Sequence, residues 1–215
     1  MREGCIAKCL PNTMTNVKRL SSLWDIVVET KGLNGDLVEA GVYKGGCSMM
    51  MAFALKYINS DKKLFLLDTF KGMTKPCEKD VKVNKGTPYF NKWEENNKGD
   101  FNNWCYSPLD EVKKNLLKTD YPNIEFIERD VCDTIPDDKI KNLSVLRLDV
   151  DFYKGTFHLL SNLFHLLETG GYLIIDDYNC WEGCKEAVNE FFLEEGLNIN
   201  DLEEIDHSCV IYIKK

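Results

Sequence analysis

The stretch SVLRLDVDFY, residues 144–153, decides the fold, and GGYLIIDDYN, residues 170–179, repeats its pattern. Each contains a short apolar run that ends in a pair of aspartates. Apolar runs of this length are typical of parallel strands that are buried on both faces. We therefore predict strands over 144–148 and 172–175, each with acidic residues at its carboxyl end. The four aspartates are Asp149, Asp151, Asp176 and Asp177.

These four carboxylates are expected to meet. In an open α/β sheet, ligands bind beyond the carboxyl ends of the strands, and two neighbouring strands would bring the four side chains to one place. Clustered carboxylates repel one another unless protons or a cation neutralise them. Oxygen ligands alone suit Mg²⁺, Mn²⁺ or Ca²⁺ better than zinc. The alternative is that the aspartates are helix caps and turn residues, positions where Asp is favoured.

The rest of the chain alternates strands with helices, which predicts a parallel sheet with right-handed crossovers. Residues 1–15 show little pattern and are expected to be an arm or disordered. The absence of repeats and linkers predicts a single domain over residues 1–215. The other predicted strands are 36–40, 64–67, 123–128 and a final edge strand in the tail CVIYIKK, residues 209–215. The predicted helices are 16–30, 47–57, one that begins at Ser107-Pro108 with Ser107 as cap, 153–167 and 182–195.

Residues 74–105 interrupt this alternation. They are rich in Lys, Asn, Asp and Gly and carry scattered aromatic side chains. A long irregular segment inside a compact domain is usually a lid, a binding loop or disorder, and disordered segments are poor in aromatic residues. We therefore predict a lid here. The aromatic residues are Tyr89, Phe90, Trp93, Phe101 and Trp104.

The composition excludes several classes of protein. With 27 basic and 35 acidic residues, the net charge of −8 argues against a partner that is a nucleic acid. No stretch approaches 18 apolar residues, and the first residues lack the apolar core of a signal peptide, so we expect a soluble, cytoplasmic protein without a membrane partner. None of the nine cysteines form a CxxC pair, which favours reduced, packed thiols over a zinc site.

A second signal is the stretch DLVEAGVYKGG, residues 36–46, in which a strand turns through glycines into a helix. Glycine lets the backbone approach a ligand closely and adopt positive φ. The pattern is neither G-x-G-x-x-G nor a P-loop, and the nearby acidic residues Glu39 and Asp68 disfavour a pyrophosphate. The glycines are Gly41, Gly45 and Gly46.

Asp68 ends the next predicted strand, where a carboxylate commonly holds ribose hydroxyls. The turn and Asp68 together indicate a nucleoside cofactor with a neutral or cationic tail. S-adenosylmethionine, with its amino group and sulfonium, fits that description. The alternative is an ordinary strand-to-helix turn in which glycine only permits the bend.

Five stretches of the chain resemble the macrocin O-methyltransferase (TylF-like) family, whose members methylate sugar hydroxyls on macrolides and related natural products. The resemblance runs from about residue 13 to the C-terminus, and the pairing LRLDxDxY…GGYxIxDDY is its most specific part. It implies an α/β, Rossmann-like class I methyltransferase fold: a mostly parallel seven-stranded sheet with helices on both faces. It also implies S-adenosylmethionine and Mg²⁺ (or Mn²⁺) as cofactors. The stretches are VEAGVYKGG (38–46), DTFKGM (68–73), DVCDTIP (130–136), VLRLDVDFYKGT (145–156) and GGYLIIDDYNCWEGCKEAVNEFF (170–192).

The resemblance also assigns roles to residues. It implies Asp149, Asp176 and Asp177 as metal ligands and Asp151 as the base. Val150 stands where the family usually has Gly, which leaves the ligands intact and is expected to alter either the geometry of the strand end or the shape of the pocket. The N-terminus is shorter than is usual in the family, so the oligomer contacts that the family makes there need not form. Whether the chain forms a homo-oligomer is left undecided. The residues expected at the cofactor are Glu39, Gly41, Val42, Tyr43, Gly45, Gly46, Asp68, Thr69, Phe70, Asp130 and Val131.

The expected reaction is metal-dependent methyl transfer to a hydroxyl of a sugar or glycosylated small molecule. The metal would lower the pKa of the hydroxyl, Asp151 would take its proton, and the oxygen would attack the sulfonium methyl. One alternative is a glycosyltransferase, because DVD resembles the DxD motif that binds a metal and a nucleotide-sugar. The other is a catalytically inactive binding domain of the same fold.

Overall fold

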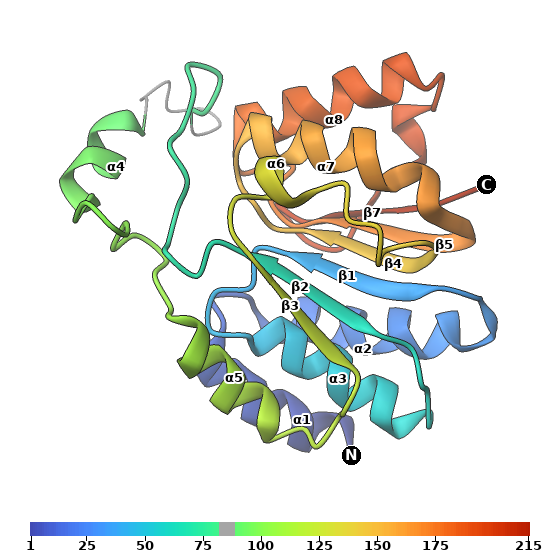
Figure 1. The fold of residues 1–215 in the computed structure, drawn as a ribbon. Coiled ribbons are helices and arrows are strands. Elements are labelled where there is room, and N and C mark those ends of the chain that lie inside the picture. Colours follow the sequence, from blue (N-terminus) through green and yellow to red (C-terminus); the bar gives the residue numbers. More distant parts are fainter. Residues whose placement is uncertain (82–88) are drawn as a thin grey trace.

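The computed structural model describes residues 1–81 and 89–215. Within these ranges, seven strands form a sheet in the order β3-β2-β1-β4-β5-β7-β6 (Figure 1). The first five strands in sequence pair in parallel, whereas β7 is antiparallel to both β5 and β6. The predicted mostly parallel seven-stranded sheet is confirmed. The strands are β1 Asp36–Ala40, β2 Leu64–Asp68, β3 Ile124–Glu128, β4 Leu143–Leu148, β5 Leu167–Ile175, β6 Glu203–Glu204 and β7 Val210–Ile213.

Helices cover both faces of this sheet, as predicted. Helices α1, α2, α3 and α5 lie on one face, and α6, α7 and α8 lie on the other (Figure 1). Single 3-10 turns follow several of the helices. The α-helices are α1 Arg2–Cys9, α2 Val17–Glu29, α3 Gly46–Tyr57, α4 Phe90–Asn96, α5 Leu109–Leu117, α6 Val131–Thr134, α7 Tyr153–Leu163 and α8 Glu182–Glu194.

The two cores follow from the alternation of side chains along each strand. In β4, Leu146 and Leu148 pack toward α7 and α8, whereas Val145 packs toward α2 and α3. The next residue on the α2 side is Arg147, a charged side chain in an otherwise apolar strand. Glu39 of the neighbouring strand β1 pairs in register with Arg147 and shares its face. A buried acid–base pair therefore lies under one side of the sheet.

Three sequence expectations need correction. Residues 1–15 are not an unstructured arm, because α1 packs Ile6 and Cys9 into the core beside α3. Helix α5 begins at Leu109 with Pro108 as its N-cap, so the predicted cap Ser107 lies one position before the observed one. The tail strand β7 is not at the edge of the sheet, because the two-residue strand β6 pairs outside it.

Part of the predicted lid, residues 82–88, lies outside the described residues. The described remainder does have an element of its own, the helix α4, which the composition did not predict. The base of the segment is closed by backbone hydrogen bonds, from Met73 N–H to Trp104 O (3.0 Å) and from Asn102 N–H to Lys71 O (2.7 Å). A mobile lid role stays a prediction.

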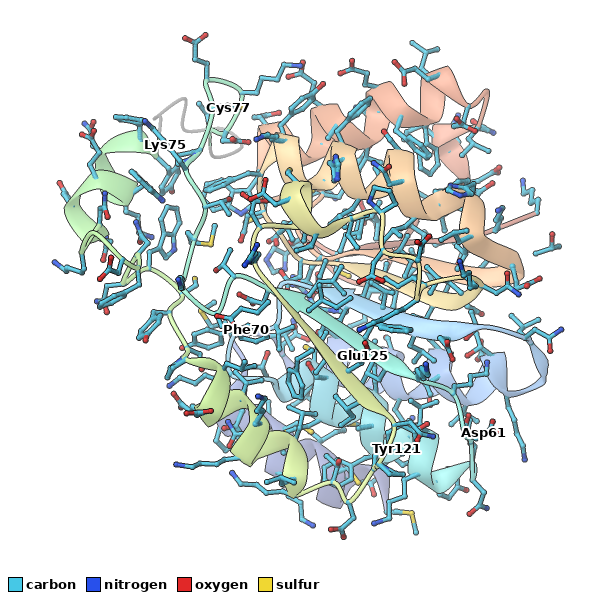
Figure 2. All side chains as sticks on the ribbon, viewed as in Figure 1. Asp61, Phe70, Lys75, Cys77, Tyr121 and Glu125 are labelled. Carbon is cyan, nitrogen blue, oxygen red and sulfur yellow. The ribbon has the colours of Figure 1, made fainter. Side chains whose placement is uncertain are left out.

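The segment lies at the functional edge of the sheet. Lys75 and Cys77, which follow β2, lie on the opposite side of the molecule from Asp61 and Tyr121, which precede β2 and β3 (Figure 2). The segment 74–105 therefore borders the carboxyl ends of the strands, where ligands bind in this class of sheet. Among the described residues, no helix has the length and apolar character needed to cross a membrane.

Candidate active site and metal centre

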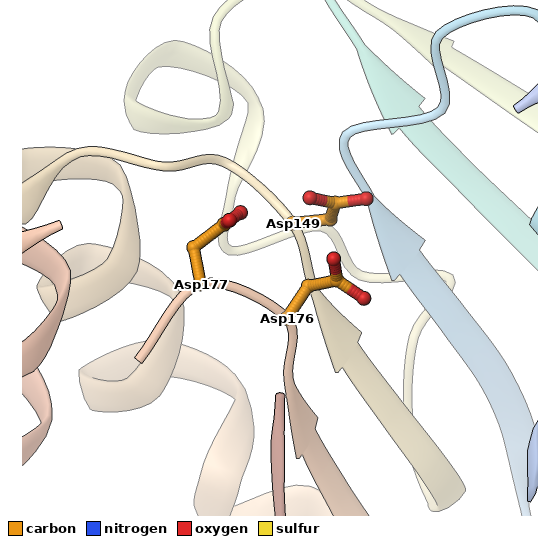
Figure 3. A group of neighbouring side chains, drawn as sticks. All are labelled: Asp149, Asp176 and Asp177. Carbon is orange, nitrogen blue, oxygen red and sulfur yellow. The ribbon is translucent and has the colours of Figure 1, made fainter. Parts of the chain in front are cut away.

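Three aspartates meet at the carboxyl ends of β4 and β5. These strands are parallel neighbours, and the pair Leu148 and Ile175 fixes their ends side by side. Asp149 follows the first strand, and Asp176 and Asp177 follow the second. Each carboxylate offers one oxygen within 4.8 Å of the others (Figure 3). The structure thus brings together the three residues that the sequence assigns to a metal.

The chemistry of this donor set fits a hard divalent cation. All three groups are carboxylates, and together they offer oxygens without nitrogen or sulfur, which is the set that Mg²⁺ and Mn²⁺ prefer. They project from strand ends, so the backbone that carries them is fixed by the sheet. Asp149, Asp176 and Asp177 fit the metal that the family resemblance implies, and their role as ligands stays a prediction.

Two arginines, which the sequence reasoning missed, neutralise part of this cluster. The Arg147 guanidinium donates to Glu39 Oε1 (2.8 Å), Asp149 Oδ2 (2.8 Å) and Asp176 Oδ1 (2.7 Å). Its side chain is 3% exposed. Arg19 of α2 donates to the other oxygen of Asp176 at 2.5 Å. The signal for Arg147 was its place in a buried strand, because a charge there needs a partner.

The remaining charge of the cluster is not neutralised. Burial raises the pKa of Asp177 well above its usual range, and Asp151, Asp149 and Asp176 raise it further. Burial, together with Asp149 and Asp176, also raises the pKa of Asp151 to about 8. Burial and the neighbouring carboxylates therefore disfavour further negative charge here, and a cation at this place would relieve the repulsion.

Asp151 occupies a tight turn between β4 and α7. Its φ is +59°, in the left-handed region that side chains other than glycine rarely adopt. Phe152 N–H donates to Val150 O across the turn at 2.6 Å. The Trp181 side chain interacts with the Asp151 carboxylate and lowers its pKa, against the effect of burial. Asp151 does not belong to the three-carboxylate group, but it lines the cavity beside it. This position suits the predicted base.

A cavity of about 230 Å³ opens at the carboxyl ends of β1, β2 and β4, next to the aspartate cluster. Most residues that line it come from turns after strands, which is where the fold places ligands. The predicted residues that line it are Gly41, Tyr43, Asp68, Thr69, Asp130, Val131, Asp149 and Asp151. The lining residues that the sequence did not single out include Met14, Met73, Cys105, Arg129, Phe152 and Lys154.

Asp68 organises the turns around this cavity. Its carboxylate accepts hydrogen bonds from the N–H groups of Val42 (2.7 Å), Tyr43 (3.1 Å) and Phe70 (2.8 Å), with the Thr69 hydroxyl at 3.4 Å. Burial raises the pKa of Asp68, and these bonds oppose the shift. Val42 and Phe70 are therefore buried structural partners that do not line the cavity. A contact from Asp68 to ribose stays a prediction.

Other residues expected at the cofactor lie elsewhere. Glu39 is fully buried, pairs with Arg147 and accepts a hydrogen bond from Ser48, so its side chain faces α3 and not the cavity. A Cβ on Gly45 would approach the Leu116 side chain, and one on Gly46 would meet the Asn12 and Thr13 segment. These three residues shape the turn from behind.

Gly41 is different, because its position does require glycine. Its φ is +84°, and a Cβ there would lie 1.8 Å from the backbone oxygen of Asp149. The turn after β1 therefore passes directly against the residue that begins the aspartate cluster. This close approach joins the cavity to the carboxylates.

An aromatic cluster surrounds Phe152, the residue after Asp151. Phe152 and Trp181 are buried with ring centroids 5.5 Å apart, and Trp104 and Tyr89 from the predicted lid pack against them. The ring centroids of Tyr89 and Trp181 are 4.7 Å apart, and those of Trp104 and Phe152 are 6.0 Å apart. Aromatic residues of the segment thus meet the turns that carry the carboxylates.

Comparisons with known proteins agree with this geometry. The family described as Macrocin-O-methyltransferase (TylF) matches residues 7–214. Demethyldecarbamoylnovobiocin O-methyltransferase from Streptomyces niveus is 32% identical over 185 residues, which cover 84% of this chain and 67% of the relative. Mycinamicin III 3''-O-methyltransferase from Micromonospora griseorubida is 30% identical over 208 residues, covering 94% and 78%.

Solved structures show the same fold. The O-methyltransferase NovP superposes with a TM-score of 0.81 at 30% identity, covering 95% of this chain and 82% of NovP. The calicheamicin methyltransferase CalS11 superposes with a TM-score of 0.73 at 15% identity, covering 95% of this chain and 81% of CalS11. The predicted class I methyltransferase fold is confirmed.

Proposed function

Because the chain belongs to the macrocin O-methyltransferase (TylF) family and is an O-methyltransferase, we propose that it methylates a hydroxyl of a sugar or a glycosylated small molecule. S-adenosylmethionine is the proposed donor. The observation that carries the proposal is the group formed by Asp149, Asp176 and Asp177, whose oxygens lie within 4.8 Å beside a cavity at the strand ends.

The cavity supports a nucleoside cofactor. Gly41 and Tyr43 line it from the turn after β1, and Asp130 and Val131 line it from the start of α6. Asp68 lies between them, with the N–H groups of the neighbouring turns already bonded to its carboxylate. In this proposal Asp68 holds both turns in shape and receives the ribose hydroxyls.

The chain's own residues prepare the acceptor hydroxyl. Asp149, Asp176 and Asp177 would hold Mg²⁺ or Mn²⁺, which supplies Lewis acidity that lowers the pKa of a hydroxyl. Asp151, which lines the cavity next to them, takes the proton. The sheet fixes the ends of β1 and β4 against each other at Gly41, which keeps the donor and the proton acceptor in one geometry.

The acceptor side of the site is aromatic. Trp104 and Tyr89 reach Phe152 and Trp181 from the segment 74–105 and cover the turn that carries Asp151. Such a cover excludes water from a methyl transfer, which supports the proposed lid role of this segment. The names of the relatives describe methylation of a novobiocin precursor and of mycinamicin III, and these support a glycosylated natural product as the acceptor.

The family match favours methyl transfer over the glycosyltransferase alternative. The inactive binding domain is disfavoured by the intact carboxylates. A protein without catalysis gains nothing from a cluster in which burial and mutual repulsion raise the pKa values of three carboxyl groups, those of Asp151, Asp176 and Asp177.

The test is methyl transfer from labelled S-adenosylmethionine to two acceptor probes, demethyldecarbamoylnovobiocin and mycinamicin III, with Mg²⁺ and after treatment with EDTA. We expect labelled product that depends on the divalent ion, and thermal stabilisation by S-adenosylhomocysteine. Stabilisation by UDP and not by S-adenosylhomocysteine would show that the donor assignment is wrong. Stabilisation by S-adenosylhomocysteine with label in neither probe would restrict the error to the acceptor.

A further inference from the structure

Asp80 is a buried carboxylate outside the site described above, at the junction of two helices. It is 1% exposed and lies in the segment between β2 and α4. Its Oδ1 accepts a hydrogen bond from Tyr153 N–H, the first residue of α7, at 2.8 Å. Its Oδ2 accepts one from Cys77 N–H at 2.7 Å, and Cys77 is marked on this segment in Figure 2. Both oxygens are therefore used, one within the segment and one on α7.

The second helix at this junction is α8, whose first turn is shaped to receive Asp80. A Cβ on Gly183 would lie 2.0 Å from Asp80 Oδ1, so a side chain at that position would displace the carboxylate. Glu182 N–H, at the start of α8, donates to Val81 O at 3.0 Å. The residues around Asp80 thus bind the amino ends of α7 and α8 at the same time.

A layer of side chains closes the junction from outside. Lys79 Nζ lies 3.7 Å from the ring centroid of Tyr153 and 2.7 Å from Glu186 of α8. The Tyr153 hydroxyl donates to Glu190 of α8 at 2.7 Å. These groups are partly exposed and each contributes modestly, so the buried carboxylate is the central contact.

The two helix starts are also the ends of the loops that carry the reactive carboxylates. Tyr153 comes two residues after Asp151, and α8 begins directly after Trp181, whose side chain interacts with Asp151. Asp151 itself has a φ of +59°, a conformation that persists only where its surroundings hold it. The Asp80 carboxylate accepts the hydrogen bond of Tyr153 N–H on the helix side of this turn.

We propose that Asp80 is a positioning residue for Asp151: it clamps the starts of α7 and α8 and so holds the Asp151 turn in its reactive geometry. The inference rests on the proposed role of Asp151 as the base. Asp80 touches neither the cavity nor the aspartate group, so it acts through the backbone of Tyr153. It also links the base of the segment 74–105 to the catalytic turn.

Three variants separate positioning from folding. Asp80→Ala removes both hydrogen bonds, Asp80→Asn keeps an oxygen for Tyr153 N–H, and Gly183→Ala displaces the carboxylate without removing it. We expect Asp80→Ala and Gly183→Ala to lower kcat on whichever of the two acceptor probes is methylated, by on the order of 10²-fold for a misplaced base. Affinity for S-adenosylhomocysteine should stay unchanged, and Asp80→Asn should retain more activity than Asp80→Ala.

The decisive comparison is the double variant Asp80→Ala with Asp151→Asn. If Asp80 acts through Asp151, the double variant turns over no more slowly than Asp151→Asn alone. Losses that multiply would overturn the positioning role. An Asp151→Asn variant with normal turnover would instead overturn the proposed base. Thr119→Ala, which alters a buried turn at the opposite edge of the sheet, is the matched control and should leave kcat unchanged.

Amide hydrogen exchange tests the same clamp without any acceptor. Folded Asp80→Ala should exchange faster than wild type at Phe152, Tyr153 and Glu182, because the contacts that hold these helix starts are lost. Thr119→Ala should leave these amides unchanged. Unchanged exchange at Phe152 and Tyr153 in a folded Asp80 or Gly183 variant would overturn the inference even if neither probe is methylated.

Discussion

Arg19 binds two aspartates, Asp206 and Asp176, whose pKa values are shifted in opposite directions from the usual value. Its guanidinium donates to Asp206 through Nε (2.7 Å) and Nη2 (3.0 Å) and to Asp176 through Nη1 (2.5 Å). Burial disfavours ionisation of Asp206, but hydrogen bonds from Arg19 and from the N–H groups of Cys209 and Ser208 outweigh it and lower its pKa. Burial and the neighbouring Asp149 raise the pKa of Asp176 despite two arginines.

The difference shows that a shared arginine does not decide the state of a carboxylate. Asp206 accepts hydrogen bonds from backbone N–H groups, and no acidic residue in the described part of the chain is among its contacts, so its charge is fully compensated within the fold. Asp176 lies beside Asp149 and Asp177, so each further negative charge is costly. Carboxylates that the protein saturates organise the fold, and those left crowded are available for a proton or a cation.

The largest expected effect is on turnover, and it comes from substitutions in the crowded aspartate cluster. Asp151→Asn should keep the affinity for S-adenosylhomocysteine and Mn²⁺ but lose about 10²–10⁴-fold in kcat, the usual cost of a missing general base. Asp149→Asn should lose Mn²⁺ affinity first, because Asp149 belongs to the three-carboxylate group. Calorimetry and steady-state kinetics on the same preparations measure both.

Two results would contradict this division of roles. Normal turnover of Asp151→Asn would show that Asp151 is not the general base. A primary loss of Mn²⁺ affinity in that variant would make Asp151 a ligand and not a base.

A smaller effect separates two members of the predicted ligand set. Asp176 binds Arg147 and Arg19, whereas Asp177 has no salt bridge in the described part of the chain. In the metal-free protein, Asp176→Asn should therefore lower stability by about 1–3 kcal/mol, because charged hydrogen bonds are lost. Asp177→Asn should leave stability unchanged or raise it, because burial and the neighbouring carboxylates already disfavour a charge at this position.

Both variants should lose the rise in Tm that Mg²⁺ produces in wild type. Thermal melts with EDTA and with Mg²⁺ give the two quantities together. Equal destabilisation of the metal-free protein by both substitutions would mean that the arginines do not distinguish the two carboxylates. An undiminished Mg²⁺ shift would remove that residue from the ligand set.

Much of this site could be predicted from local sequence. Apolar runs that end in aspartates place Asp149, Asp176 and Asp177 at strand ends, and parallel strands bring such ends together. The same reasoning misplaced Glu39, because side chains alternate along β1 and this one faces Arg147 and not the cavity. Strand ends are local features, whereas the face of a buried charge depends on its partner.

Long-range contacts were the part that sequence could not give. Arg19 lies 157 residues before Asp176, and no local pattern joins them. Asp80 lies in a segment whose composition indicated only irregular structure, yet it binds the start of α7, 73 residues later. The edge position of β6 rests on two residues, too few to form a strand pattern. Each of these depends on tertiary packing.

The smallest expected effect concerns Asp206, the carboxylate whose hydrogen bonds are all satisfied within the fold. The lowered pKa of Asp206 means that its ionised form stabilises the fold above the unfolded pKa of about 3.9, and that this contribution is lost as pH falls. Asp206→Asn should therefore lower stability by about 1–2 kcal/mol at pH 7, since the amide keeps its backbone donors but loses the charge that Arg19 binds. The gap to wild type should narrow below about pH 4, where the unfolded wild-type chain begins to bind a proton at Asp206 that the folded protein does not bind. Asp25→Asn is the matched control: its arginine partner is Arg2, but the two side chains are 52% and 40% exposed, so its gap should be small at every pH.

Thermal melts from pH 7 to pH 3 measure both gaps. A gap for Asp206→Asn that stays constant with pH would show that the pKa of Asp206 does not differ between the folded and unfolded states. The contrast between Asp206 and Asp176 would then be wrong.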